Sequence, residues 1–166
     1  PASPPQPGAA PEAALPPAAP AGEERPVVIP VKPDAEVWEF LGRTRSGDTY
    51  YNKTATPVSG DIISVTTYKI ITEDYRNQTI DEKKKNSPQQ SVKYQRYEHN
   101  VRIDEIDCAL KRYRVKEVTH VDDQGNVLDR YAYENEDWKT IPVLTELDML
   151  REKLCPLPKK SKKKKR

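Results

Sequence analysis

Proline is concentrated at one end of this chain and limits where a fold can form. Eleven of the 16 prolines lie within residues 1–33, where they alternate with alanine and glycine. Such a composition leaves almost no side chains for a core and is typical of extended, polyproline-like chain. We therefore expect residues 1–33 to be a disordered Pro/Ala-rich leader or tether. The folded domain is expected over residues 34–158.

Basic charge is concentrated at the opposite end. The chain has 28 lysine and arginine residues against 26 aspartate and glutamate residues, and seven of the 28 lie within residues 159–166. The rest of the chain is therefore net acidic, which argues against a globally basic nucleic-acid-binding protein. We expect residues 159–166 to be a disordered polybasic tail that attracts anionic partners. Its candidate anion-binding residues are Lys159, Lys160, Lys162, Lys163, Lys164, Lys165 and Arg166.

The apolar runs are too short for a membrane span. None approaches the roughly 18 residues that a transmembrane helix requires. The chain opens with Pro-Ala-Ser-Pro and shows no basic segment followed by an apolar stretch. We expect either a cytosolic protein or one whose targeting segment preceded Pro1.

Between the two ends the pattern predicts an antiparallel sheet. Runs rich in β-branched and aromatic residues are separated by turn residues. Six strands are predicted, over residues 36–45, 48–54, 61–72, 92–106, 109–121 and 127–133. The third has apolar residues on both faces and is expected to be central. Residues 77–91 are highly charged and are predicted to be a solvated, mobile loop.

A helix is predicted after the last strand. Thr145 can serve as its N-cap with Asp148 at the third helical position, while Leu144 and Met149 can close a hydrophobic staple. A stripe of leucines then needs burial against the sheet, namely Leu147, Leu150 and Leu154. The predicted fold class is α+β, mainly β, with an antiparallel sheet of about six strands and this C-terminal helix packed on it.

Cys108 and Cys155 are the only cysteines. A disulfide between them would stabilise the fold by about 4 kcal/mol in the chain-entropy model. Two free buried thiols in a reducing cytosol are the alternative. A metal site with His99 or His120 would match no recognised motif, and nucleophilic catalysis by Cys108 lacks a known signature.

A second basic feature lies in the fifth predicted strand, where Arg112, Arg114 and Lys116 share one face. The row is a candidate anion-binding surface. Alternatively, acids on a neighbouring strand neutralise it, with Asp129, Glu134 or Glu136 as the candidates. Trp38 and Trp138 are expected to be core residues rather than ligand platforms.

Signatures of an enzyme are missing from the sequence. It contains only six glycines and no glycine-rich phosphate loop, and no nucleophile stands in a known catalytic motif. We therefore predict a protein that is not an enzyme, with no catalytic residues, no metal and no cofactor.

Several landmarks follow one another in a characteristic order and spacing. They are Trp38, Tyr50-Tyr51, Asp107-Cys108, Lys111-Arg112-Tyr113-Arg114, Gly125, Trp138-Lys139-Thr140-Ile141-Pro142 and a short helix ending in Cys155. Over about residues 38–155 this order resembles the bacterial surface-adhesin protein E family. The resemblance implies an antiparallel sheet with the terminal helix packed on it and a Cys108–Cys155 disulfide. It also implies the bacterial cell envelope (periplasm or outer-membrane surface) or secretion, sometimes as a lipoprotein.

Together, these observations predict an exported, non-catalytic binding or adhesin-like interaction module with a cationic tail. The expected partners are an extracellular or envelope protein, or an anionic polysaccharide or lipid, and exposed sheet edges would allow a homodimer. Family members from host-associated bacteria bind extracellular-matrix proteins, but the shared landmarks are structural and identify no adhesive site. The alternative is a nucleic-acid-binding protein that acts through its polybasic tail.

Overall fold

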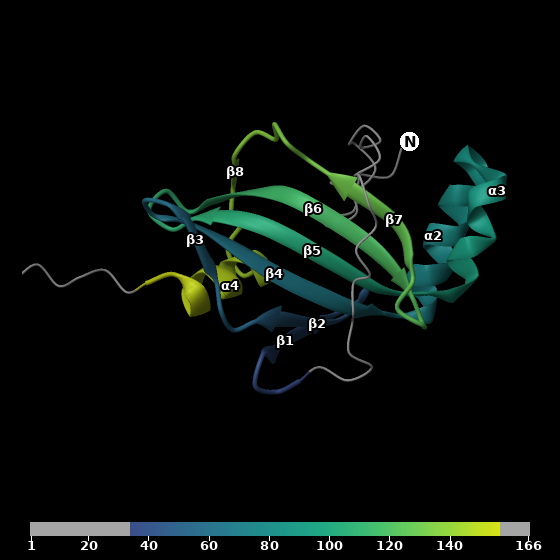
Figure 1. The fold of residues 1–166 in the computed structure, drawn as a ribbon, viewed down its shortest axis with the longest axis horizontal. Coiled ribbons are helices and arrows are strands. Elements are labelled where there is room, and N and C mark those ends of the chain that lie inside the picture. The colour runs from purple at the N-terminus through teal and green to yellow at the C-terminus, as the bar shows by residue number, and fades with distance from the viewer. Residues whose placement is uncertain (1–33, 157–166) are drawn as a thin grey trace, which may run out of the picture.

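The computed structural model describes residues 34–156. The predicted leader (1–33) and polybasic tail (159–166) lie outside the described residues. Within them, a twisted antiparallel sheet carries helices at its two ends (Figure 1). The predicted fold class is therefore confirmed.

Eight strands form the sheet, and all pair in antiparallel fashion. They are β1 (Trp38–Thr44), β2 (Gly47–Asn52), β3 (Thr56–Ser59), β4 (Ile62–Ile71), β5 (Tyr97–Asp107), β6 (Arg112–Asp122), β7 (Val127–Ala132) and β8 (Lys139–Thr140). The spatial order is β1-β2-β4-β5-β6-β7, with β3 also pairing with β4 and β8 with β6. The six long strands correspond to the six predicted ones, and β4 is central as expected. The short β3 and β8 were not predicted.

One glycine is required by the tight connection between β1 and β2. Gly47 has φ 148° and lies opposite Ile71 of β4. A Cβ atom at this position would clash with the Ile70 carbonyl. Only glycine tolerates both the backbone angle and the close approach.

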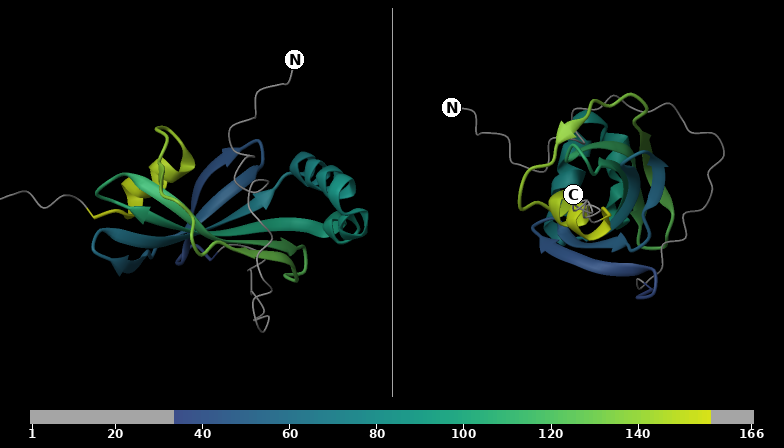
Figure 2. Two further views of the ribbon diagram at one scale, coloured as in Figure 1. Left: turned by 90° about the horizontal axis from the view of Figure 1, so that it is seen from above. Right: turned by 90° about the vertical axis from the view of Figure 1, so that its left-hand side faces the viewer.

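The predicted C-terminal helix is α4 (Glu146–Leu154). The Thr145 side chain caps it by accepting the Asp148 N–H. Leu150 is 2% exposed and lies in the main core, with Leu147 and Leu154 packed against that core. The other members of this core are Leu41, Tyr51, Ile63, Val65, Ile106 and Ile141. The sheet curves around α4 (Figure 2), and the predicted leucine stripe faces it, with Leu150 buried and Leu147 and Leu154 partly buried.

The predicted hydrophobic staple of α4 is absent. Leu144 is 93% exposed and Met149 is 39% exposed, so neither covers the other. Leu144 adopts φ 61°, in the left-handed region, and its side chain lies in solvent. Its N–H instead donates to Asp148 Oδ2, which stabilises the cap by a polar contact.

The prediction of a mobile loop over residues 77–91 is wrong. Most of it is helical, in α2 (Glu73–Asn86), α3 (Pro88–Ser91) and the following 3₁₀ turn η1 (Lys93–Arg96). The turn also delays the start of β5, which was expected at residue 92. Apolar periodicity does not reveal α2, because Ile80 is its only buried residue.

Local capping and one tertiary contact explain α2. The Thr72 side chain accepts the Tyr75 N–H at 3.2 Å. Acidic residues fill the first turn and lysines the last, which complements the helix dipole. Ile80 packs into a second core with Ile71, Tyr94 and Tyr97.

None of the helices within residues 34–156 combines the length and apolar character needed to cross a bilayer.

Candidate functional site

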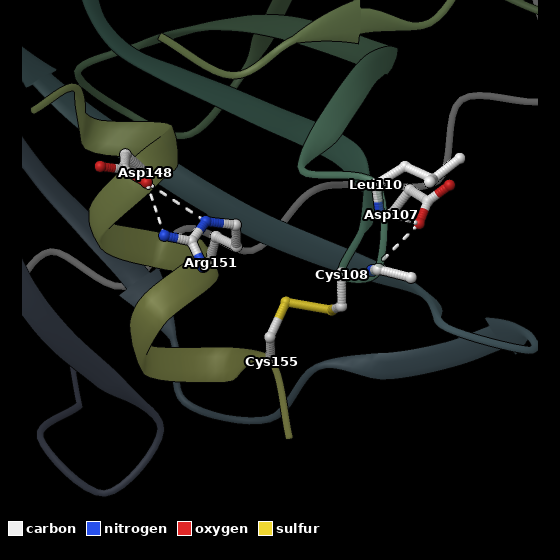
Figure 3. The surroundings of a disulfide bond; sticks show 7 residues. Asp107, Cys108, Leu110, Asp148, Arg151 and Cys155 are labelled. Carbon is white, nitrogen blue, oxygen red and sulfur yellow. Dashed lines mark hydrogen bonds and ion pairs between the residues drawn. A yellow bond between two sulfur atoms is a disulfide. The ribbon is translucent and has the colours of Figure 1, made fainter. Parts of the chain in front are cut away.

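The Cys108–Cys155 disulfide joins the end of α4 to the turn between β5 and β6 (Figure 3). The two Cα atoms are 5.7 Å apart. The bond holds the exit of the chain at one end of the sheet, so whatever follows Pro156 starts from a fixed place. The two cysteines were correctly predicted, and within residues 34–156 neither is a free thiol.

Asp107 organises the turn next to the disulfide. Its carboxylate accepts the Ala109 and Leu110 N–H groups and the Arg112 Nε–H, at 3.0–3.1 Å. Burial alone would raise the pKa of Asp107, but these hydrogen bonds outweigh it and hold the pKa below its usual value. The carboxylate is therefore a structural part of the turn.

The predicted basic row on β6 is paired with acids. Arg114 Nε lies 2.8 Å from Glu105 Oε1, Arg112 bonds Asp107, and Lys116 Nζ lies 3.9 Å from Glu105 Oε1. The acids come from β5, where Glu105 is directly opposite Arg114 and Asp107 opposite Arg112. They were expected from Asp129, Glu134 or Glu136, but Asp129 pairs with Lys83 and Lys93 instead.

Trp138 covers the other side of the two guanidinium groups. The Arg112 and Arg114 Cζ atoms lie 4.9 and 4.4 Å from its ring centroid. This cation–π stacking leaves Trp138 half-buried. Trp38 is also half-buried, so the expectation that both tryptophans are core residues is wrong.

An aromatic face, formed by Trp38, Phe40, Tyr50, Tyr68 and His99, lies on the side of the sheet opposite α4. Phe40 is paired with Tyr50 across β1 and β2, and Tyr50 with Tyr68 across β2 and β4. The Tyr50 and Tyr68 rings stack with centroids 5.4 Å apart, and the Trp38 ring meets Tyr68 edge-on at 5.0 Å. His99 on β5 approaches Tyr68 at 6.1 Å.

Exposure differs strongly across the aromatic face. Tyr68 is 2% exposed at its centre, whereas Phe40 is 48% exposed and Trp38 and Tyr50 are half-buried. Burial, followed by the nearby Tyr50, raises the pKa of Tyr68 to about 12. Within residues 34–156, neither the Tyr68 hydroxyl nor His99 Nδ1 has a hydrogen-bond partner. The face thus exposes the Phe40 ring at its edge, while its two unpartnered polar atoms are buried beneath the rings.

β1 forms the edge of the sheet beside this face. A bulge between Phe40 and Gly42 interrupts its pairing with β2. At its far end Arg43 forms a two-point ion pair with Asp48, with Nε–Oδ1 at 2.7 Å. Bulges and charged side chains of this kind limit indiscriminate edge-to-edge pairing.

A buried polar cluster links η1 to β6 and β7. The Tyr94 hydroxyl contacts His120 Nδ1 at 2.8 Å and donates to Asp129. Lys93 Nζ lies 3.0 Å from Asp129 Oδ1. Burial, then the bond to Asp129, raises the pKa of Tyr94 far above its ordinary value. A hydroxyl that stays protonated in a closed core is suited to a structural role.

The described residues contain no group of three or more His, Cys, Asp or Glu side chains arranged to hold a metal ion. The aromatic face was not predicted as a surface. Its members are spread over residues 38–99, and only the cross-strand register brings them together.

A family model described as Surface-adhesin protein E matches residues 38–156. The match covers almost the whole described domain, including both cysteines and the aromatic face. No curated protein and no solved structure gives a significant match to the chain.

Proposed function

The chain belongs to the surface-adhesin protein E family, and on that basis we propose that it is an exported, non-catalytic binding module of the bacterial cell envelope. Membership points to contact with partners outside the cell. The finer proposal is that the aromatic face, together with edge strand β1, forms the contact surface.

Exposure of the aromatic face is the observation that carries this proposal. Aromatic side chains supply large apolar contact areas and are enriched at the centres of protein interfaces. Phe40 and Tyr50 sit side by side at the edge of the sheet, and Phe40 is 48% exposed. A β-strand or loop of a partner protein would gain both backbone pairing with β1 and ring contacts there.

The polybasic tail and the basic row provide the proposed electrostatic part. Seven charges within residues 159–166 would attract an acidic polysaccharide, an anionic lipid or an acidic protein over several ångströms. Arg112, Arg114 and Lys116 would contribute less, because buried carboxylates already pair with them. Residues 1–33 would act as the tether that holds the domain away from the envelope, and β1 would also serve a homodimer.

A double variant, Phe40→Ser with Tyr50→Ser, tests the aromatic face. The probes are purified extracellular-matrix proteins immobilised on a sensor surface, and heparin as the acidic polysaccharide. We expect about tenfold weaker binding to the protein probes, because truncating interface aromatics commonly costs more than 1 kcal/mol. The matched control is Val58→Ser, which removes a 49% exposed apolar side chain from β3.

Three results would overturn parts of this assignment. Unchanged binding of the double variant to a protein that the native chain binds would remove the aromatic face from the contact surface. Heparin binding that survives deletion of residues 159–166 would remove the tail. Salt-sensitive binding to DNA or RNA that disappears with the tail, in a chain that binds no extracellular protein, would favour the nucleic-acid-binding alternative.

A further inference from the structure

Three exposed apolar residues lie just before α4 or in its first turns. Val143 is 79% exposed, Leu144 93% and Met149 39%. The Leu144 N–H donates to Asp148 Oδ2 at 3.1 Å, which ties the backbone of this residue to the first turn of the helix. We call Val143, Leu144 and Met149 the α4 patch.

Leu144 is unusual in both its side chain and its backbone. Its φ of 61° lies in the left-handed region, which is a rare conformation for a bulky residue outside special sites. The neighbouring leucines of α4 are directed into the sheet, with Leu150 only 2% exposed. The fold therefore buries one leucine stripe and holds a separate leucine in water.

The tail begins at the other end of the same helix. α4 has nine residues, so its two ends are roughly 13 Å apart at 1.5 Å per residue. The disulfide holds Cys155 at the β5–β6 turn, and the last ten residues of the chain, 157–166, can span at most roughly 33 Å. Seven of these ten residues are basic. An apolar contact and a strong positive charge are thus available to one surface.

We infer that the α4 patch and the polybasic tail together bind the surface of a membrane rich in anionic lipid. The inference rests on the proposed role of the tail in anion binding and specifies the ligand. Polybasic segments are attracted to anionic headgroups, and apolar side chains enter the headgroup boundary. Weak membrane signals of these two kinds give stable attachment when they act together.

The charges near the α4 patch permit this approach. Asp148 is paired with Arg151, with Nη2–Oδ1 at 2.8 Å, and Glu152 lies 3.7 Å from the same guanidinium. Lys153 Nζ lies 4.0 Å from Glu39 Oε1. These side chains comprise two bases and three acids, a net charge of −1, so attraction to anionic headgroups comes from the tail. A polysaccharide or nucleic acid would engage the same tail but would leave the apolar side chains in water.

Vesicle binding tests the inference directly. The full chain is mixed with vesicles of phosphatidylcholine alone or with added phosphatidylglycerol, and partitioning is measured by sedimentation. We compare the native chain, the double variant Val143→Ser with Leu144→Gly, and a chain lacking residues 159–166. Glycine suits the backbone angle at position 144, so the double variant should fold.

The control variant is Val92→Ser. Val92 is 71% exposed and lies between α3 and η1, at the opposite end of the sheet (Figure 1). This change removes a comparable apolar side chain far from α4. It should leave partitioning within about twofold of the native value.

We expect the native chain to bind only the anionic vesicles. The patch variant should partition about tenfold more weakly, as for the loss of two partly inserted apolar side chains. Deletion of the tail should reduce partitioning by about a hundredfold or more, since each basic residue adds to the attraction. In about 0.5 M salt the contribution of the tail falls, while the ratio between native chain and patch variant should persist.

Other outcomes would separate this inference from the proposed function. Equal partitioning of the native chain and the patch variant would overturn it, even if deletion of the tail abolished vesicle binding. Loss of heparin binding in the patch variant would also overturn it, because the patch would then act on polyanions in general. Native binding to heparin without any binding to anionic vesicles would reject the membrane and leave the tail's role intact.

Discussion

At one end of the sheet, α4 is joined to the β5–β6 turn by Cys108–Cys155 and buries leucines in the main core. At the other end, α2 and η1 cover a smaller core, and Tyr94 reaches His120 and Asp129 through buried polar contacts. The first end depends on a covalent bond and apolar area, which tolerate small shifts in geometry. The second depends on donors and acceptors that must meet at fixed distances. The two ends should therefore respond to different perturbations.

The largest effect is expected from removing the disulfide. The double variant Cys108→Ser with Cys155→Ser should lose about 4 kcal/mol of unfolding free energy, as the chain-entropy model gives for a separation of 47 residues. Urea denaturation under oxidising conditions measures the loss, and reductant should bring the native chain to the same midpoint. Amide exchange should accelerate in α4 more than in α2. Equal acceleration in both helices would contradict the contrast between the two ends.

A smaller loss is expected when the apolar contact of α2 is truncated. Ile80 is 5% exposed and packs against Tyr94 and Tyr97. Ile80→Ala should cost about 3 kcal/mol, from lost burial and the cavity left behind. The helical signal in the far-UV circular dichroism spectrum of the protein should weaken, because α2 is the longest helix within residues 34–156, while the disulfide stays intact. Val92→Ala at the same end is the exposed control and should stay within about 0.5 kcal/mol of the native protein.

Lowering the pH tests both ends of the sheet in the same way, because a buried aspartate stabilises a turn at each end. Hydrogen bonds hold the pKa of Asp107 and that of Asp122 below the usual value, although burial opposes this in both. A lowered folded-state pKa means that the ionised carboxylate stabilises the fold above about pH 4 and that this stabilisation is lost as the pH falls further. Asp107→Asn and Asp122→Asn should each cost about 1.5 kcal/mol at pH 7.

Denaturation midpoints measured from neutral to acidic pH check this expectation. The difference between each variant and the native protein should shrink below about pH 4. A difference that stays constant down to the acid-unfolded state would mean that shape, not charge, is what Asp107 or Asp122 supplies.

Sequence patterns predicted α4 because its stability signals are local. The leucine stripe, the Thr145 cap and the nearby prolines all lie within one short segment. In α2 the only buried residue is Ile80, and its partners Tyr94 and Tyr97 lie outside the helix. The usable signal was the Thr72 cap followed by acidic and then basic turns. A capping residue followed by an acidic and then a basic turn thus indicates a helix even in a highly charged segment. The residues that bury such a helix lie elsewhere in the chain.

Surface features were harder to predict than the strands that carry them. Phe40, Tyr50 and Tyr68 meet only because β1, β2 and β4 pair in one register, with a bulge after Phe40. A shift of one residue in β1 would turn Phe40 toward α4. The acids opposite Arg112 and Arg114 were likewise sought on the wrong neighbouring strand, since β6 pairs with β5 over that stretch. Pairwise register is a tertiary property that strand patterns do not contain.

The disulfide also determines how the domain would carry mechanical force. The bond closes a covalent ring that contains β6, β7, β8 and α4. Tension between the start of β1 and Cys155 would pass through the two sulfur atoms to the end of β5 and leave the ring slack. The ring's 47 residues would then add nothing to the stretched length, which shortens the fully extended chain by roughly 160 Å. A domain exposed to fluid shear would thus unravel only from β1 to β5.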